Sequence, residues 1–260
     1  MELISIITPA YNAVAFLAQA IESVQEQTYV YWEMLIVDDH STDATVDLIK
    51  RYQQQDNRIK LLQTPVNGGP AAARNVGIQQ ARGVYLAFLD ADDYWLPEKL
   101  AVQRAYMIER EAAFSFTAYR RIAQDNQRWS EVVQVDPKVD YASLLNRTQI
   151  ATLTVMLDRR LFDSIEMAAG VGHEDYLLWL QLLKQTPYAH GIQQDLARYR
   201  VVENSVSSNY LTSVQWVWNI YRRHEHLSLL SATRHLCSYA YYAFRKRMDF
   251  ALTLAPDEVK

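Results

Sequence analysis

Three acidic residues, Asp90, Asp92 and Asp93, follow the hydrophobic run at 84–89. This run is short, continuously apolar and ends at a polar break, which predicts a buried strand. Carboxylates gathered at the end of a strand repel one another and lose hydration, so a cation should compensate them. Oxygen ligands favour Mg²⁺ or Mn²⁺ over zinc, and a metal held by one or two carboxylates leaves room for a diphosphate. The alternative is an acidic loop that caps the helix expected after Pro97.

Strands and helices are predicted to alternate in the first part of the chain. Apolar runs at 3–8, 33–37, 59–63 and 84–89 predict strands, and the segments between them carry apolar residues at helical spacing. Such alternation predicts βαβ units and a mostly parallel sheet. Ligands then belong at the carboxyl ends of the strands, where Pro9, Asp39 and Asp90 fall.

The pattern changes after a helix predicted over 98–111. Phe114, Phe116 and Ala118 alternate with polar residues, which predicts a strand with one buried face. Residues 129–135 and 152–157 predict further strands, and a helix should follow Glu174 and Asp175. From Tyr210 onward the chain is predicted to be helical.

Composition excludes several classes of protein. A net charge of −4 and a pI near 5.9 argue against nucleic acid as a partner. Cys237 has no second cysteine with which to form an intrachain disulfide or a cysteine-rich zinc site. The first residues lack a basic leader, and no run of about 18 apolar residues occurs, so we predict neither a signal peptide nor a transmembrane helix. These features favour a cytoplasmic location.

Five motifs occur together in a recognisable order and spacing. They are Pro9-Ala10-Tyr11-Asn12, Val37-Asp38-Asp39 with Ser41-Thr42-Asp43, Ala73-Arg74-Asn75, Phe88 to Asp93, and Glu174-Asp175, with a looser sixth at Tyr199-Arg200, Ser205 and Ser207. Through these motifs the chain resembles, over roughly residues 3–207, the GT-A glycosyltransferases of family 2. These are inverting enzymes that use nucleotide-diphosphate sugars.

The resemblance implies an α/β fold of the GT-A type, in which helices flank a Rossmann-like, mostly parallel sheet. Residues 1–110 would form the nucleotide-sugar-binding half, and residues 111–209 the acceptor-side half of the same domain. Residues 210–260 would be a helical C-terminal extension. The implied reaction moves a sugar, with Mn²⁺ or Mg²⁺ as cofactor, from a UDP-sugar to a hydroxyl of a glycan or lipid-linked saccharide in cell-surface polysaccharide synthesis.

The resemblance also implies a donor site. Its residues would be Pro9, Tyr11, Asp39, Asn67, Arg74, Asp90, Ala91 and Asp92. The first three would hold the nucleobase and ribose, since a carboxylate accepts hydrogen bonds from uracil N3–H or ribose hydroxyls. Arg74 would neutralise the diphosphate, with Asn67 in the loop beside it. The alternatives are a helix N-cap for Asp39 and a solvent-facing helix position for Arg74.

The metal and the catalytic base are implied in the same way. Asp92 would bind the metal, Asp90 would contact the ribose or a metal-bound water, and Asp93 would cap the following segment. Asp175 would take the proton from the acceptor hydroxyl, with Glu174 beside it, although two acids in a first helical turn also complement the helix dipole. Many relatives carry a histidine where Val202 stands, so metal binding here would rely on Asp92 and the donor phosphates, or the closing loop works differently.

Other interpretations stay open at this point. The aromatic and basic residues between Trp216 and Arg247 could lie on an anionic membrane at its inner face, or could form an ordinary packed cap. A nucleotidyltransferase would need a Gly- and Lys/Arg-rich loop after the first strand, where Pro9-Ala10-Tyr11-Asn12 stands instead. A catalytically inactive nucleotide-sugar-binding subunit would not need every acid that the chemistry requires, yet all are present.

Overall fold

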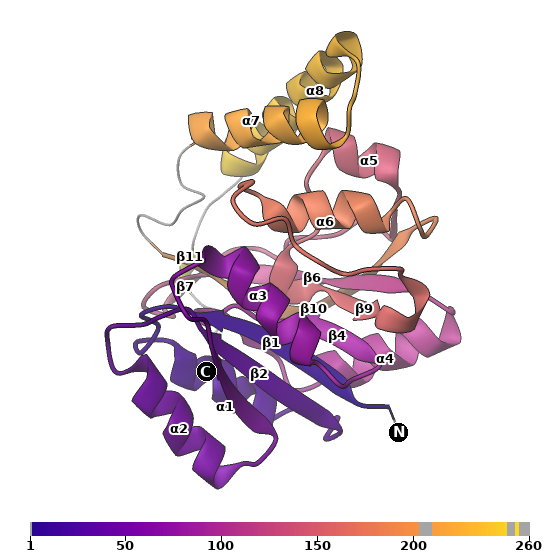
Figure 1. Cartoon of the computed structure of the whole chain (residues 1–260). Helices are drawn as coiled ribbons and strands as arrows, with labels where there is room; N and C mark the ends of the chain where they lie inside the picture. The colour runs from indigo at the N-terminus through magenta and orange to yellow at the C-terminus, as the bar shows by residue number, and fades with distance from the viewer. Residues whose placement is uncertain (1, 203–209, 249–252, 255–260) are drawn as a thin grey trace.

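The computed structural model describes residues 2–202, 210–248 and 253–254. Figure 1 shows a central sheet with helices on both of its faces and a pair of helices at one end of the molecule. The helices are α1 (Leu17–Gln25), α2 (Thr45–Gln55), α3 (Gly69–Gln80), α4 (Lys99–Glu109), α5 (Tyr141–Asn146), α6 (Glu174–Leu182), α7 (Tyr210–Asn219) and α8 (Leu229–Met248). The strands are β1 (Ile4–Ala10), β2 (Trp32–Asp38), β3 (Ile59–Gln63), β4 (Tyr85–Phe88), β5 (Tyr94–Trp95), β6 (Phe114–Ala123), β7 (Arg128–Trp129), β8 (Lys138–Val139), β9 (Met156–Asp158), β10 (Ala189–Val201) and β11 (Thr253–Leu254).

The sheet contains the predicted parallel core. Its main path runs β11-β7-β6-β9-β4-β1-β2-β3, and β3, β2, β1 and β4 pair in parallel. β9 joins β4 and β6 through antiparallel pairs, so the sheet is continuous across the division predicted at residue 110. β10 pairs with β6 in parallel and with β5 in antiparallel fashion, which brings the acceptor-side part of the chain back to the segment after β4. The division at residue 110 into a nucleotide-sugar-binding half and an acceptor-side half stays an interpretation.

Alternating side chains of the parallel strands form two hydrophobic clusters, one on each face of the sheet. Ile7, Leu86 and Phe88 belong to the cluster that α3 and α6 cover, whereas Ile4 and Ile6 belong to the one that α1 and α4 cover. This arrangement follows from the period of two residues along a strand. The sheet is therefore buried on both faces, and its polar strand ends remain as the place for a site.

Helix α3 lies unusually close to β1. A Cβ built on Gly77 would lie 2.7 Å from Cγ2 of Ile7, so a larger residue there would push the helix away from the strand. Pro70 occupies the first turn of α3, as predicted, where its missing N–H is not needed. The close approach at Gly77 packs the C-terminal half of α3 directly against β1.

Several predictions for the second half were wrong. β6 is buried on both faces, since Ser115 and Thr117 are also fully buried and Gln103 of α4 donates to the Ser115 hydroxyl. Of the predicted 129–135 strand, only Trp129 lies in a ladder, as part of β7, and Val133 makes an isolated bridge to Tyr119. A 3₁₀ turn, Thr152–Thr154, replaces the first half of the predicted 152–157 strand. Helices α7 and α8 confirm the helical prediction for the part of the C-terminal region that is described.

The C-terminal aromatic residues are mostly packed rather than exposed. Tyr221 is fully buried, Tyr239 is 7% exposed, and Trp218 packs against the cluster that α6 covers. Trp216 is half-buried against the ring of His173. The rings of Trp218, Tyr221 and Tyr239 therefore agree with the packed-cap interpretation, because they complete the core. No helix of the described residues is long and apolar enough to cross a membrane.

Lys99 of α4 is a fully buried lysine that predicts a pH effect on stability. Its Nζ donates to Oε1 of Gln103 at 2.6 Å and lies 4.0 Å from the centre of the Trp95 ring. Burial lowers the pKa of this amine well below its ordinary value of 10.5. In the interval between the two values the unfolded chain binds more protons, so the free energy of unfolding should rise with pH by up to about 1.4 kcal/mol per unit.

Lys99→Met should flatten that rise at alkaline pH below 10.5, measured by urea denaturation. Lys50→Met, which alters an exposed lysine of α2, should keep the wild-type slope. An unchanged slope in Lys99→Met would contradict the assignment.

Candidate active site

The loops after β1 and β2 are tied together by Asn12. This residue adopts a left-handed conformation with φ 47°, and its Oδ1 accepts hydrogen bonds from the backbone N–H groups of Thr42 and Asp43 at 2.9 and 3.3 Å. Its own N–H donates to Ser41 Oγ at 2.9 Å. Beside Asn12, the Tyr11 side chain is 52% exposed at the carboxyl end of β1. The first two motifs therefore form one unit that presents Tyr11 at the strand ends.

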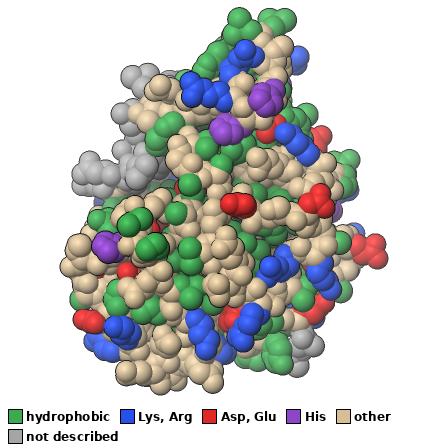
Figure 2. All heavy atoms as spheres, viewed as in Figure 1, with side chains coloured by type: hydrophobic (Ala, Val, Ile, Leu, Met, Phe, Trp, Pro, Cys, Tyr) green, Lys and Arg blue, Asp and Glu red, His purple; other side chains and the backbone are tan. Residues whose placement is uncertain are grey.

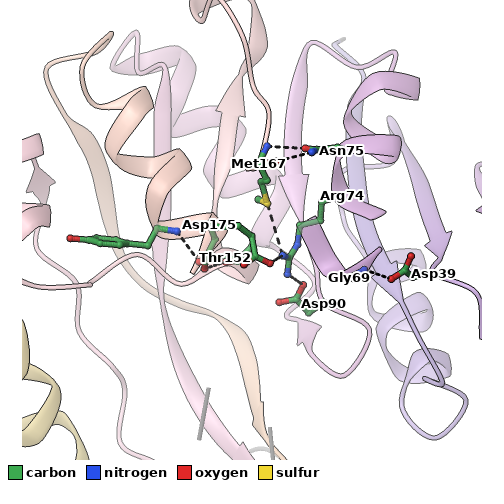
Figure 3. Close-up of polar contacts among 10 residues, drawn as sticks. Asp39, Gly69, Arg74, Asn75, Asp90, Thr152, Met167 and Asp175 are labelled. Atoms are coloured by element: carbon green, nitrogen blue, oxygen red, sulfur yellow. Dashed lines mark hydrogen bonds and ion pairs between the residues drawn. The ribbon is translucent and has the colours of Figure 1, made fainter. Parts of the chain in front are cut away.

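Asp39 follows β2 and is almost completely buried. Its Oδ1 accepts from Thr64 Oγ1 at 2.7 Å and from the Gly68 N–H at 3.0 Å. Its Oδ2 accepts from the Gly69 N–H at 2.7 Å (Figure 3). The helix-cap alternative is wrong, because Ala44 occupies the N-cap of α2. Asp39 instead holds the loop that opens α3, in which Asn67 is exposed. Its contact with a nucleotide stays a prediction.

Arg74 of α3 joins two of the predicted acidic groups. Its Nη2 lies 2.5 Å from Oδ1 of Asp90, and its Nη1 lies 3.7 Å from Oε1 of Glu174. Figure 3 shows Arg74 between Asp90 and the turn that carries Asp175. Burial by itself would lower the pKa of Arg74, but the charges of Asp90, Asp175 and Glu174 outweigh burial and raise it. The solvent-facing alternative is therefore wrong, since the residue Arg74 is only 7% exposed.

Asp92 is a partly buried carboxylate whose charged form a bound cation would stabilise. Burial and the neighbouring charge of Asp90 raise the pKa of Asp92 from its ordinary value to about 6. Ala91, between the two, has its side chain buried in the cluster that α1 and α4 cover. Helix α4 begins at Lys99 without a side-chain cap, so the interpretation of these acids as a helix cap is wrong.

Asp93 and Arg200 connect the acidic loop, residues 90–93, to β10. Oδ1 of Asp93 accepts from the backbone N–H of Arg200 at 2.7 Å, so Asp93 does not cap the following segment as predicted. The buried Arg200 side chain donates to the Asp92 carbonyl at 2.7 Å and to Gln19 Oε1 at 2.6 Å. β10 thus fixes the backbone that carries Asp92.

Glu174 and Asp175 form the first turn of α6. Oδ2 of Asp175 accepts from Thr152 Oγ1 at 2.6 Å, and its Oδ1 accepts from the Tyr176 N–H at 2.7 Å. This position agrees with the helix-dipole interpretation and also leaves Asp175 within electrostatic reach of Arg74. The two interpretations are therefore compatible, and the role of Asp175 as base stays a prediction.

The end of β4 fits a hard divalent cation. Asp90 and Asp92 supply oxygen atoms alone, and burial, followed by the charge of Asp90, raises the pKa of Asp92, so a cation would stabilise its charged form. Among the residues that the structure describes, no three His, Cys, Asp or Glu side chains gather to hold a metal. Asp90 and Asp92 are the residues that would hold such a cation.

Four residues of the site were not predicted as members. Thr152 positions Asp175, Arg200 positions the acidic loop, and Asn75 bonds both backbone groups of Met167, at 2.7 and 2.8 Å. Asn75 and Arg200 stood in quoted motifs without a role, whereas Thr152 and Met167 carried no sequence signal. Val202 lies just after β10, and Ser205 and Ser207 fall outside the described residues.

Comparisons with known proteins show the family of this chain. The family profile described as "Glycosyl transferase family 2" matches residues 5–168. TuaG of Bacillus subtilis, named provisionally as a teichuronic acid biosynthesis glycosyltransferase, is 41% identical over 246 residues, which cover 95% of this chain and 98% of TuaG. WfgD of Escherichia coli, a UDP-Glc:α-D-GlcNAc-diphosphoundecaprenol β-1,3-glucosyltransferase, is 37% identical over 219 residues, which cover 84% of this chain and 85% of WfgD.

Two solved structures share the fold. Residues 1–349 of S. aureus TarS in complex with UDP-GlcNAc match with a TM-score of 0.73 and 20% identity, over 94% of this chain and 73% of that one. A mannosyltransferase of Pyrobaculum calidifontis in complex with GDP-Man and Mn²⁺ matches with a TM-score of 0.67 and 17% identity, over 95% and 71%. The sheet, its acidic edge and these likenesses define a glycosyltransferase with the GT-A fold. The chain belongs to glycosyltransferase family 2.

Proposed function

We propose that this protein is a metal-dependent, inverting glycosyltransferase that moves a sugar from a UDP-sugar to a hydroxyl of a glycan or lipid-linked saccharide. The observation that carries the proposal is the Arg74 network. A single buried guanidinium contacts Asp90 of the predicted donor and metal site and approaches Glu174, the neighbour of the predicted base. Donor phosphates and the acceptor hydroxyl must meet within a few ångströms, and this network brings their predicted partners together.

The chain's own residues would divide the work. Asp90 and Asp92 would hold Mn²⁺ or Mg²⁺, which supplies stabilisation of the negative charge on the departing nucleoside diphosphate. Tyr11 offers an exposed ring at the strand ends, where a nucleobase could stack. Asp175, oriented by the Thr152 hydroxyl, would accept the proton of the attacking hydroxyl.

The relatives favour the finer points of this proposal. WfgD is named for a UDP-glucose donor and a diphosphoundecaprenol-linked acceptor, and TarS was solved with UDP-GlcNAc. The mannosyltransferase was solved with Mn²⁺, which favours a divalent cation here. We propose that the reaction serves cell-surface polysaccharide synthesis and takes place in the cytoplasm, where nucleotide sugars are made.

Donor binding can be tested by thermal shift. UDP or a UDP-sugar should raise the melting temperature only when Mn²⁺ or Mg²⁺ is present, since Asp90 and Asp92 would hold the cation and the cation would attract the diphosphate. At 100 times its Kd the nucleotide should add about 2.7 kcal/mol to the free energy of unfolding. GDP under the same conditions is the matched control for the base. Binding without transfer or hydrolysis of any sugar would favour an inactive subunit, and stabilisation by UDP without metal would contradict the proposal.

Asp92→Asn should have opposite effects on the two states of the enzyme. Removing a carboxylate that is crowded by burial and by Asp90 should leave the metal-free protein as stable as wild type or more so. The same change should remove the metal-dependent stabilisation by UDP and lower turnover by about 100-fold or more. Asp47→Asn, at an exposed position of α2, should change neither the metal-dependent stabilisation by UDP nor the turnover. A variant that keeps metal-dependent turnover would show that Asp92 is not a ligand.

A further inference from the structure

The C-terminal helical pair carries a charge opposite to that of the rest of the chain. The 39 residues from Tyr210 to Met248 contain six Lys or Arg residues and one acid, Glu225. All other segments together contain 20 Lys or Arg residues and 29 Asp or Glu residues. A net positive element on a net negative protein indicates a partner with negative charge that this element alone contacts.

The single acid of this segment is hidden from the surface. The Glu225 side chain is 1% exposed, its Oε2 lies 2.6 Å from Nζ of Lys184, and Tyr141 donates to the same carboxylate. Arg222 and Arg223, in contrast, are exposed on the π-helical turn Ile220–His224. The exposed charge of this end is therefore positive.

An apolar tip accompanies these charges. Leu229 and Leu230 begin α8 and are 63% and 84% exposed, the second being the most exposed large apolar side chain among the described residues. Figure 2 shows hydrophobic side chains at this end of the molecule beside Lys, Arg and His side chains. Leucines left in water beside cationic side chains are a typical membrane-binding combination, because one group enters the interface and the other attracts lipid phosphates.

From Leu230, a stripe of exposed side chains continues along α8. Leu230, Arg234, Cys237 and Tyr241 recur at intervals of three or four residues and are all exposed, so they share one face of the helix. We define these four residues as the α8 stripe. A tyrosine at this position suits the headgroup level of a bilayer.

The helical pair also touches the predicted catalytic turn. The ring centroid of Trp216 on α7 lies 5.3 Å from that of His173, which directly precedes Glu174. A Cβ on Gly172, which has φ 70°, would lie 2.3 Å from the Trp216 ring, so the contact is tight. The α8 stripe therefore belongs to a helical pair that packs directly on the active-site turn.

We propose that the α8 stripe, together with Leu229 and the exposed Arg223, docks this enzyme on a bilayer that contains anionic lipids. Leu229 and Leu230 enter the interface, and Arg223 and Arg234 face the lipid phosphates. The role of this docking in presenting a lipid-linked acceptor rests on the function proposed above. The docking itself is measured without donor, metal or acceptor, so its failure and that of the proposed function are distinguishable.

The first test is sedimentation of the full chain with vesicles. Wild-type protein should pellet with vesicles in which about one third of the lipid is phosphatidylglycerol, and salt should release it by screening. It should pellet weakly with vesicles of phosphatidylcholine alone. Equal binding to both vesicles, or binding to neither, would overturn the proposal.

Matched variants test the residues. Arg223→Gln with Arg234→Gln should weaken binding to the anionic vesicles by about 25-fold, from about fivefold for each charge. Lys50→Gln with Arg51→Gln removes the same charge from exposed positions of α2, which Figure 1 shows at the opposite end of the molecule, and should have no such effect. Equal losses in the two double variants would mean that net charge alone drives binding, and would overturn the proposal.

Cys237, the single cysteine of the chain, reports on the docked face directly. A charged, water-soluble maleimide should alkylate it severalfold more slowly when anionic vesicles are present, and the Arg223→Gln, Arg234→Gln variant should lose this protection. Leu229→Ser with Leu230→Ser should weaken vesicle binding by about tenfold, whereas Val30→Ser, at an apolar position 61% exposed, should not. Alkylation at an unchanged rate on vesicle-bound protein would overturn the assignment of this face.

Discussion

Asp175→Asn should lower kcat by about 100-fold or more and leave the Kd of the donor near its wild-type value. An amide cannot accept the proton of the attacking hydroxyl, so the loss falls on a group needed mainly in the transition state. The substitution is nearly isosteric and keeps an oxygen that can accept the Thr152 hydroxyl, which lies 2.6 Å from Asp175. Steady-state kinetics and donor titration measure the two quantities separately.

Two companion variants sharpen this result. Glu174→Gln should keep most of the turnover if Asp175 is the base, because Glu174 approaches Arg74 at 3.7 Å and has no assigned proton to accept. Thr152→Val should lower kcat less than Asp175→Asn, since it removes only the orientation of the carboxylate. The product should have the opposite anomeric configuration to the donor. Normal turnover in Asp175→Asn would move the role to Glu174 or elsewhere, and poor donor binding would make Asp175 structural.

Arg74→Met should lower the free energy of unfolding by about 3 kcal/mol in the absence of any ligand. The guanidinium compensates Asp90 at 2.5 Å and approaches Glu174 at 3.7 Å, so its removal leaves carboxylates without a cation in a largely buried place. Urea denaturation of Arg74→Met and of the wild-type protein measures this difference.

A surface arginine supplies the control for that result. Arg110 pairs with Glu109 at 3.3 Å, with both side chains more than half exposed, and Arg110→Met should change stability by only about 0–1 kcal/mol. Arg74→Lys should fall between wild type and Arg74→Met, since an ammonium keeps the charge but not the fork that reaches two acids. A fully stable Arg74→Met would mean that water already compensates the acids, and the network would then have no structural role.

The pattern of apolar residues along the sequence was sufficient to predict the strands of the parallel half of the sheet. The strands at β1, β2, β3 and β4 are short apolar runs with polar breaks, and the helices between them repeat apolar residues at helical spacing. The motifs follow directly from these boundaries, because the residues after a strand end must lie at the edge of the sheet. The acids at Asp39, Asp90 and Asp92 were found for that reason.

For β10 the pattern of apolar residues was insufficient to predict a strand. Its thirteen residues contain two register shifts against β6, around Asp195, so its side chains do not alternate regularly between two faces. The prediction that β6 has only one buried face was wrong for another reason. Ser115 and Thr117 are polar yet buried, and Gln103 donates a hydrogen bond to Ser115. Alternation of polar and apolar residues cannot distinguish a strand face exposed to solvent from a buried face whose polar groups are hydrogen-bonded by another element.

The sequence by itself determined the family, the parallel core and the identity of the acids near the strand ends. Only the tertiary structure decided that Arg74 joins Asp90 to Glu174, that Thr152 orients Asp175, and that Arg200 reaches back to the Asp92 carbonyl. These contacts join residues that lie 16 to 108 positions apart in the chain. Periodicity reports how one segment faces the core, whereas such contacts depend on how separate segments pack against one another, and no local pattern contains that information.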